Sequence, residues 1–294
     1  MERGGRAADA VKGGPFLRVG GVAHHVVAEG AGPVVVLSAG LGMSWFDWDP
    51  VVPLLAPRHT VVRFDRPGHG LSGPALVPPS AAGEAHRIAG ILDALGLAGP
   101  ATVVGHSIAG FHAEAFARLY PARTAGLVLV DSSVEEHARP PAAAGLRLAL
   151  ARALGSALCA AGAPAALGPA ARRATVRMSR TGGGDPAPRE LVRGCYRTSR
   201  VLRGMVLENA RYHAVAAELL CLRREFALSA GRRVVLAGGA GGARWVARQR
   251  GLAGALGAAF LLAEGAGHLV MLDAPARTAE AISPTPPLPE TLRG

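Results

Sequence analysis

The chain has 294 residues, of which 50% are hydrophobic and 18% are charged, a composition typical of a globular protein with a large core. Its formal net charge is +11, but the positive charges are arginines spread along the chain, and Lys12 is the only lysine. Aromatic residues make up 4% of the chain. A surface that stacks nucleic-acid bases needs clustered cations and aromatic rings, so the composition argues against a nucleic-acid partner.

The cysteines, the N-terminal stretch and one uncharged stretch argue against several other classes of protein. Cys159, Cys195 and Cys221 lack the spacing of a disulfide framework or a metal site. The stretch 1–15 is polar and glycine-rich, without the apolar segment of a secretory signal. The uncharged stretch 153–171 is broken by glycine and proline and is too poor in large apolar residues for stable membrane insertion. We therefore expect a cytoplasmic protein.

Apolar runs alternate with helical patterns over the first 130 residues. After an opening hairpin at 17–28, the patterns predict the following elements in chain order: a strand at 33–37, a short helix at 49–56, a strand at 60–64, a helix at 81–95, a strand at 101–104, a helix at 111–119 and a strand at 126–130. Strands that alternate with helices in this way form a parallel sheet with helices on both faces. We predict an α/β fold with a doubly wound, mostly parallel sheet.

The alternation stops after residue 133. Helical or irregular patterns fill the next hundred residues, and strand signals resume at 233–237 and 259–263 before a last helix at 275–282. A helical block between two strands of one sheet is expected to cover the carboxyl ends of the strands. The predicted organisation is a flexible N-terminus at 1–16, a core at 17–133 and 231–282, a helical cap or lid at 134–230, and a disordered proline-rich tail at 283–294.

The segment Gly105–Gly110 (GHSIAG) lies between a predicted strand and a predicted helix. A G-x-S-x-G-type elbow occupies this position in some enzymes, and its tight turn strains the serine backbone and requires small neighbours. Gly105 and Ala109 meet that requirement. Ser107 would then stand at the strand end, beside a helix N-terminus that favours developing negative charge. We predict that Ser107 is a nucleophile, with an ordinary helix-capping serine as the alternative.

Two further motifs follow the same order as those of a known family. Residues 65–72 (DRPGHGLS) form a glycine-rich turn after a strand, and Gly267-His268 is followed by Asp273 and Pro275. With the elbow, these motifs resemble the α/β-hydrolase family over about residues 17 to 282. The resemblance implies an α/β-hydrolase fold, with His268 in the place of the catalytic histidine.

A general base is also required by the chemistry itself, because a free serine hydroxyl carries almost no negative charge at neutral pH. His268 follows the last predicted strand in the glycine-rich segment 264–268, which would let an imidazole reach back across the sheet. Two other histidines are interpreted as structural, His69 in the turn at 65–72 and His106 beside the nucleophile.

A developing oxyanion needs backbone N–H groups directed at it. Ile108 follows the nucleophile and is expected to supply one of them. The second is expected from Leu41 in the turn 38–42 (SAGLG), where a glycine on each side leaves the amide approachable. The chain is similar here to a bacterial subgroup of the family that has a Gly-Leu-Gly oxyanion turn.

The acid that completes such a site is missing from its commonest place. In most members of the family it follows the strand that corresponds to 233–237, but no Asp or Glu occurs between Glu225 and Glu264. Asp131 ends the preceding strand, and the pancreatic-lipase-like and haloalkane-dehalogenase-like branches of the fold take their acid from this strand end. Asp131 is therefore the candidate to hold His268. A site without an acid, or with another carboxylate such as Glu264, remains an alternative.

The sequence predicts a serine hydrolase that cleaves an ester-like acyl substrate through a Ser107–His268–Asp131 triad and an acyl-enzyme, without cofactor or metal. The Ala- and Leu-rich cap favours an apolar small-molecule substrate. A perhydrolase or thioesterase would use the same residues. From a different class, a catalytically impaired protein that only binds a small molecule is the alternative, and the glycine-rich segment 238–242 favours it.

Overall fold

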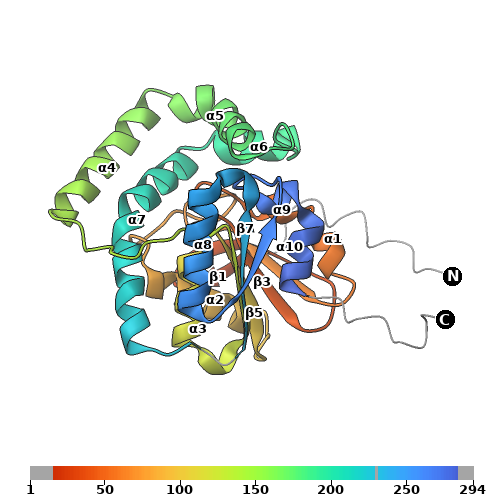
Figure 1. The fold of residues 1–294 in the computed structure, drawn as a ribbon. Coiled ribbons are helices and arrows are strands. Elements are labelled where there is room, and N and C mark those ends of the chain that lie inside the picture. Colours follow the sequence, from red (N-terminus) through yellow and green to blue (C-terminus); the bar gives the residue numbers. More distant parts are fainter. Residues whose placement is uncertain (1–15, 229–230, 284–294) are drawn as a thin grey trace, which may run out of the picture.

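An eight-stranded sheet with helices on both faces forms the centre of the computed structural model, which describes residues 16–228 and 231–283 (Figure 1). The strands are β1 (Phe16–Val19), β2 (Val22–Glu29), β3 (Val34–Ser38), β4 (Thr60–Phe64), β5 (Ala101–His106), β6 (Thr124–Val130), β7 (Arg232–Gly238) and β8 (Ala259–Ala263). Their order in the sheet is β1-β2-β4-β3-β5-β6-β7-β8. Only the β1–β2 and β2–β4 pairs are antiparallel among these strands, so the predicted doubly wound, mostly parallel sheet is confirmed.

The predicted N-terminal hairpin is present as β1 and β2. Gly20 and Gly21 connect them with φ angles of +56° and +79°. A two-residue hairpin turn of this type needs positive φ at both positions, which glycine adopts without strain. The flexible ends predicted at 1–16 and 283–294 lie outside the described residues, except that Phe16 already belongs to β1 and Ser283 follows the last helix.

The parallel strands inside the sheet are buried on both faces, whereas the edge strand β8 is only partly buried. Along β3, Val36 packs into one hydrophobic cluster and Val35 and Leu37 into the other, because successive side chains of a strand point to opposite faces. Helices α2 (Ala81–Ala94), α3 (Ala109–Leu119) and α8 (Ala243–Leu256) cover the first face. The second face is covered by α1 (Val52–Leu55), α9 (Val270–Asp273) and α10 (Pro275–Ile282), with the short 3-10 helix Trp45–Trp48.

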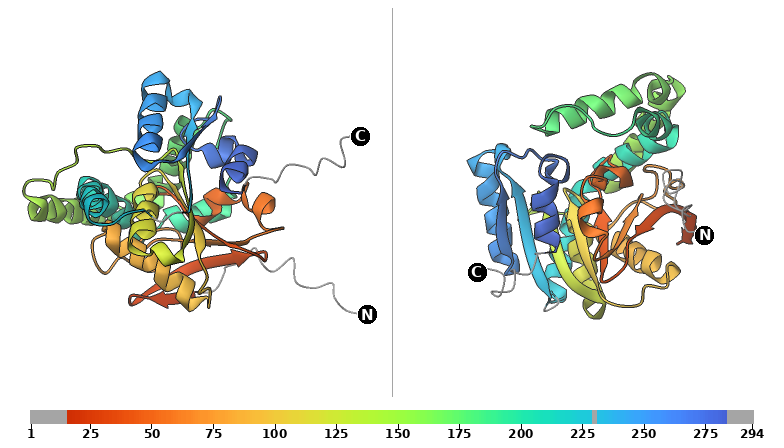
Figure 2. Two further views of the ribbon diagram at one scale, coloured as in Figure 1. Left: turned by 60° about the horizontal axis from the view of Figure 1, so that its bottom comes forward. Right: turned by 90° about the vertical axis from the view of Figure 1, so that its right-hand side faces the viewer.

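Four helices lie between β6 and β7: α4 (Ala144–Ala160), α5 (Ala163–Ser179), α6 (Arg189–Tyr196) and α7 (Ser199–Glu225). Together they are called the helical insertion, and they extend over one end of the sheet (Figures 1 and 2). The second half of α7 does not lie over the end of the sheet. Its residues Val215, Ala216 and Leu219 pack in the same core cluster as α2 and α3. Where a separate cap begins and ends therefore stays a prediction.

No single helix in the described part of the chain is both long and apolar enough to cross a membrane. Helices α4 and α5, which meet at a bend of 104°, reach the required length and composition only when taken together.

Candidate active site

Ser107 lies in the sharp turn between β5 and α3, with a φ angle of +55°. The turn can be tight because Gly105, Ala109 and Gly110 are small. A Cβ atom on Gly105 would collide with the carbonyl oxygen of Ala109, and one on Gly110 would collide with the hydroxyl of Ser132. The backbone is thus the strained elbow that the small neighbours of Ser107 predict, and it holds the serine at the carboxyl end of a central strand.

Asp131 and His268, 137 residues apart in sequence, are in contact. The Oδ2 atom of Asp131 lies 2.6 Å from Nδ1 of His268. Asp131 directly follows β6, and its own N–H donates to the carbonyl of Leu236 in β7 at 2.7 Å. The Asp131 side chain is 3% exposed, whereas that of His268, in the loop after β8, is 39% exposed. The carboxylate is therefore shielded from water, and the imidazole faces open space.

Two neutral groups hold the other oxygen of Asp131. The backbone N–H of Gly238 donates to Oδ1 at 2.9 Å, and the indole N–H of Trp245 donates to it at 2.7 Å. Hydrogen bonds from neutral donors fix the carboxylate without cancelling its negative charge. Sequence reasoning missed both donors. A tryptophan one turn into α8 carries no motif that would reveal which oxygen its indole reaches.

The glycine-rich loop after β7 packs directly against the loop that carries His268. A Cβ atom on Gly238 would collide with the carbonyl oxygen of Gly267, and the N–H of Ala240 donates to the carbonyl of Ala266 at 2.9 Å. The glycines thus allow two loops to meet behind the histidine. Glu264, the other carboxylate considered from the sequence, is exposed on the surface.

Ser107 and His268 line one cavity of about 380 Å³ between the carboxyl ends of the strands and the helical insertion. The two side chains are not hydrogen-bonded to each other within the part of the chain that the structure describes. Such contacts are often long before substrate binds. Apolar side chains from both sides form most of the wall: Leu41, Met43, Leu158, Ala163, Pro164, Leu167, Ala171, Val176, Val201, Leu202, Met205 and Leu269.

The two residues expected to supply the oxyanion N–H groups, Leu41 and Ile108, lie in the turns after β3 and β5. Leu41 lies in the turn after β3 and lines the cavity, and Ile108, which is 1% exposed, begins the turn into α3. Within residues 16–228 and 231–283, neither N–H donates to a backbone carbonyl. Gly40 lets the turn approach the elbow, because a Cβ atom there would lie 2.7 Å from His106 Nδ1 and 3.1 Å from the Cβ of Ser107.

His106, next to Ser107 in the chain, is buried beside His268. Its Nε2 donates to the carbonyl oxygen of His268 at 2.9 Å, so the ring supports the backbone of the histidine loop. Burial, with the nearby charges of His268 and Arg66, holds the pKa of His106 well below its usual value. Because the His106 ring is uncharged, it does not repel a positive charge that forms on the neighbouring His268.

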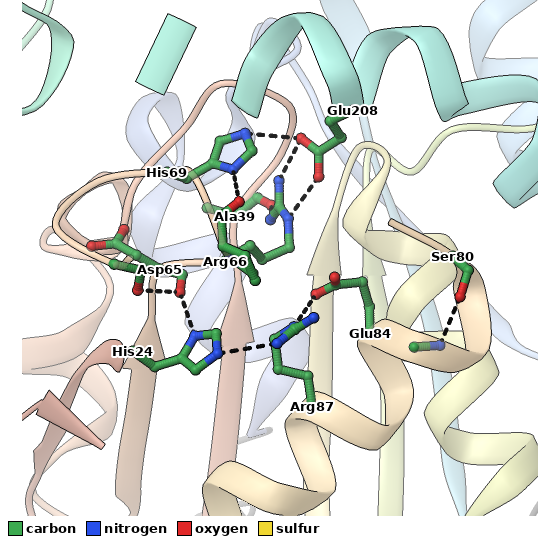
Figure 3. Close-up of polar contacts among 12 residues, drawn as sticks. His24, Ala39, Asp65, Arg66, His69, Ser80, Glu84, Arg87 and Glu208 are labelled. Carbon is green, nitrogen blue, oxygen red and sulfur yellow. Dashed lines mark hydrogen bonds and ion pairs between the residues drawn. The ribbon is translucent and has the colours of Figure 1, made fainter. Parts of the chain in front are cut away.

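The turn 65–72 is held in place by hydrogen bonds and an ion pair to neighbouring segments (Figure 3). Asp65 accepts hydrogen bonds from the backbone N–H groups of Trp45 at 3.0 Å and Leu71 at 2.9 Å. His69 is 3% exposed, its Nε2 lies 3.1 Å from Glu208 of α7, and it is not among the described residues that line the cavity. The contacts of His69 agree with the structural role expected for it.

A second buried ionic group forms part of the cavity wall. Arg172 of α5 contacts Asp47 through both terminal nitrogens and donates from Nε to Asp185 at 3.1 Å. Tyr196 lies 3.2 Å from the same guanidinium and donates its hydroxyl to the carbonyl of Gly42 at 2.7 Å. The charge of Arg172 is therefore already balanced by carboxylates of this chain.

Comparisons with known proteins place these features in context. Residues 34–281 match the model of the alpha/beta hydrolase family. A putative carbamate hydrolase, RutD, of Azorhizobium caulinodans is 35% identical over 117 residues, which cover 40% of this chain and 44% of that protein. Epoxide hydrolase B of Mycobacterium tuberculosis is 37% identical over 125 residues, which cover 38% of this chain and 33% of that protein. The matches thus span less than half of the length of these curated relatives.

Solved structures extend the likeness over nearly the whole chain. The enol-lactonase from Burkholderia xenovorans LB400 covers 91% of this chain and 98% of its own, with a TM-score of 0.64 and 22% identity, which shows a shared fold. The family model alone covers most of the sequence. On that match, the chain belongs to the alpha/beta hydrolase family, whose members are hydrolases.

Proposed function

We propose that this protein is a serine hydrolase that cleaves an ester-like substrate with an uncharged, apolar acyl group. The observation that carries the proposal is the 2.6 Å contact between Asp131 and His268, beside the strained turn of Ser107. A carboxylate at Nδ1 keeps that nitrogen protonated and leaves Nε2 as the base, which is the arrangement that a serine nucleophile needs. The glycine-rich loop after β7, which favoured an impaired protein, instead supplies a donor to this acid.

In the proposed reaction, Ser107 Oγ attacks the carbonyl carbon while His268 Nε2 takes the hydroxyl proton. The backbone N–H groups of Leu41 and Ile108 stabilise the oxyanion, and Asp131 stabilises the imidazolium. His268 then gives the proton to the leaving alkoxide, and the C–O bond of the ester breaks. Water, deprotonated by His268, attacks the acyl-enzyme and releases the carboxylic acid and Ser107.

The substrate class follows from the wall of the cavity. Its lining is mostly aliphatic and, among the described residues, contains no carboxylate. Arg172, the one guanidinium in the wall among the described residues, is paired with Asp47 and Asp185 and has no charge left for an anionic substrate. A volume of about 380 Å³ suits a small molecule of moderate length. A serine at the nucleophile position also favours acyl transfer over epoxide opening, which in this fold uses an aspartate.

A fluorophosphonate probe tests the nucleophile, and p-nitrophenyl esters of increasing acyl length test the substrate class. We expect covalent labelling at Ser107, loss of labelling and turnover in Ser107→Ala, and rates that rise with acyl length until the cavity is filled. If the folded wild-type protein is not labelled by the probe, the proposal of a serine hydrolase is wrong. A catalytically impaired protein that binds a small molecule is then the better explanation.

A further inference from the structure

Arg66 is a buried arginine that joins the core to the helical insertion (Figure 3). Its side chain, 4% exposed, follows β4. From there Nη1 donates to the carbonyl of Ala39, and Nη2 donates to the carbonyl of Gly40 at 2.9 Å. Nε and Nη2 also donate to the two carboxylate oxygens of Glu208 on α7 at 2.8 and 2.9 Å. One guanidinium therefore connects the turn after β3 to a helix of the insertion.

The Gly40 carbonyl matters because it shares a peptide plane with the N–H of Leu41. In a trans peptide these two groups point in opposite directions, so a donor that fixes the carbonyl oxygen also fixes the direction of the N–H. Glycine allows this peptide more rotation than other residues do. Within the turn, the N–H of Met43 donates to the Gly40 carbonyl at 3.1 Å, and Arg66 adds a second, charged donor.

Glu208 supplies the negative charge that lets Arg66 stay in this place. Backbone carbonyls accept hydrogen bonds but do not balance a buried positive charge, which is costly without an anionic partner. Although burial opposes ionisation of Glu208, the charge of Arg66 and then the contact with His69 hold its pKa below the usual range. The two-point contact with a planar guanidinium also fixes the orientation of Arg66.

We propose that Arg66 and Glu208 are positioning residues that direct the Leu41 N–H toward the oxyanion and make its orientation depend on the seating of α7. Neither side chain is among the described residues that line the cavity, so both act through the turn after β3. The inference rests on the proposed function, because the direction of the Leu41 N–H matters only if this amide stabilises an oxyanion in acyl transfer. It also assigns a catalytic consequence to a contact between two parts of the molecule 142 residues apart.

The test compares two carboxylates of the same helix. Glu208→Gln removes the charge next to Arg66 with little change of shape. Glu218→Gln is the matched control, since Glu218 also holds α7 to the core, where it accepts from the N–H groups of Ala81 and Ala82 at 2.8 and 3.1 Å at the start of α2. Arg66→Lys, which keeps the charge but loses the planar fork, is the second test variant.

With a p-nitrophenyl ester, we expect kcat of Glu208→Gln to fall about ten- to 100-fold, with KM changed less than about threefold. Affinity for a trifluoromethyl ketone, which forms an oxyanion on Ser107, should fall by the same factor as kcat/KM. Arg66→Lys should show the same pattern. Glu218→Gln should keep kcat within about twofold at temperatures well below its Tm.

Hydrogen exchange supplies a readout that does not need activity. Mass spectrometry of the peptide at 38–48 should show faster amide exchange in Glu208→Gln than in wild type, and unchanged exchange in Glu218→Gln. Equal effects of the two variants, or an unchanged turn in Glu208→Gln, would overturn the positioning role. If wild-type protein neither labels at Ser107 nor hydrolyses esters, the proposed function fails, and the exchange result still decides whether the ion pair orders the turn. If Glu208→Gln does not fold, Arg66→Lys carries both measurements.

Discussion

Among the described residues three buried carboxylates contact a histidine, and the pairs at Asp131 and at Glu208 differ in whether they suit chemistry. Asp131 and His268 are 2.6 Å apart, and Glu208 and His69 are 3.1 Å apart. The difference lies in the surroundings. Asp131 is held by neutral donors and His268 is 39% exposed in the cavity, whereas Glu208 is paired with Arg66 and His69 is 3% exposed.

The comparison shows that a histidine beside a carboxylate is not by itself a base. The charge of Glu208 is already used to balance a guanidinium, so it has less to offer an imidazolium. Among the contacts described for the Asp131 carboxylate, His268 is the only group that can carry a positive charge. Access to substrate and an uncompensated negative charge therefore separate the proposed catalytic pair from the structural pair.

The largest effect is expected from Asp131→Asn. The amide cannot hold His268 in the required tautomer or stabilise its charged form, so kcat for an ester should fall about 10³- to 10⁴-fold while the protein stays folded. Glu264→Gln is the matched control at the other candidate carboxylate and should change kcat less than about twofold. If Asp131→Asn retains more than a tenth of the wild-type rate, the acid lies elsewhere.

The next effect concerns stability at the structural pair. Because the pKa of Glu208 is lowered in the folded state, its ionised form stabilises the protein above the ordinary value of 4.5, and this contribution is lost as the pH falls below it. Glu208→Gln should reduce the free energy of unfolding by about 3 kcal/mol at pH 7. Urea unfolding at pH 7 and pH 3 should show the gap to wild type narrowing at the lower pH. A gap that is the same at both pH values would contradict the assignment.

A smaller effect is expected from Trp245→Phe, which keeps the ring but removes the indole N–H bound to Asp131. Loss of one of the two neutral donors should lower kcat about five- to tenfold. Trp48→Phe serves as the control, because Trp48 is fully buried in the core and does not line the cavity. Equal rates in Trp245→Phe and wild type would show that Gly238 alone is sufficient to orient the acid.

The smallest effect on turnover is expected from His69→Gln. A side chain that is buried away from the cavity should leave kcat within about threefold of wild type, even if the protein unfolds at a lower temperature. Steady-state rates and thermal unfolding of the same preparation separate these quantities. A loss of turnover comparable to that of Asp131→Asn would mean that the second pair also takes part in the reaction.

The sheet could be predicted closely because its signals are local. The strands at 60–64 and 259–263 and the helix at 275–282 begin and end where the sequence patterns place them. The helical insertion was less predictable. Its Ala- and Arg-rich segments lack a clear apolar periodicity, and α5 even continues through Pro169. Nothing in the local sequence shows that α7 runs for 27 residues and returns to the core.

At the candidate site, the elbow around Ser107 and the loop of His268 were visible because each is a contiguous motif. Asp131 could be proposed as the acid because it follows the strand at 126–130, while the usual position of the acid, after the strand at 233–237, holds no Asp or Glu. Trp245, Arg66 and Glu208 could not be found in this way, since their partners lie far away in the sequence and no spacing rule links them. Long-range hydrogen bonds become visible only once the topology brings the elements together.

The crowding at Gly238 also limits how this site could change. Its backbone donates to Asp131, and any side chain there would run into the carbonyl of Gly267. A Cβ atom on Gly239 would lie 3.2 Å from the Cα of Glu264, so the next position is also tight. An acid introduced at position 238 by a single substitution would push against the loop that carries His268. Position 238 can therefore accept a side chain only if the histidine loop is rebuilt at the same time.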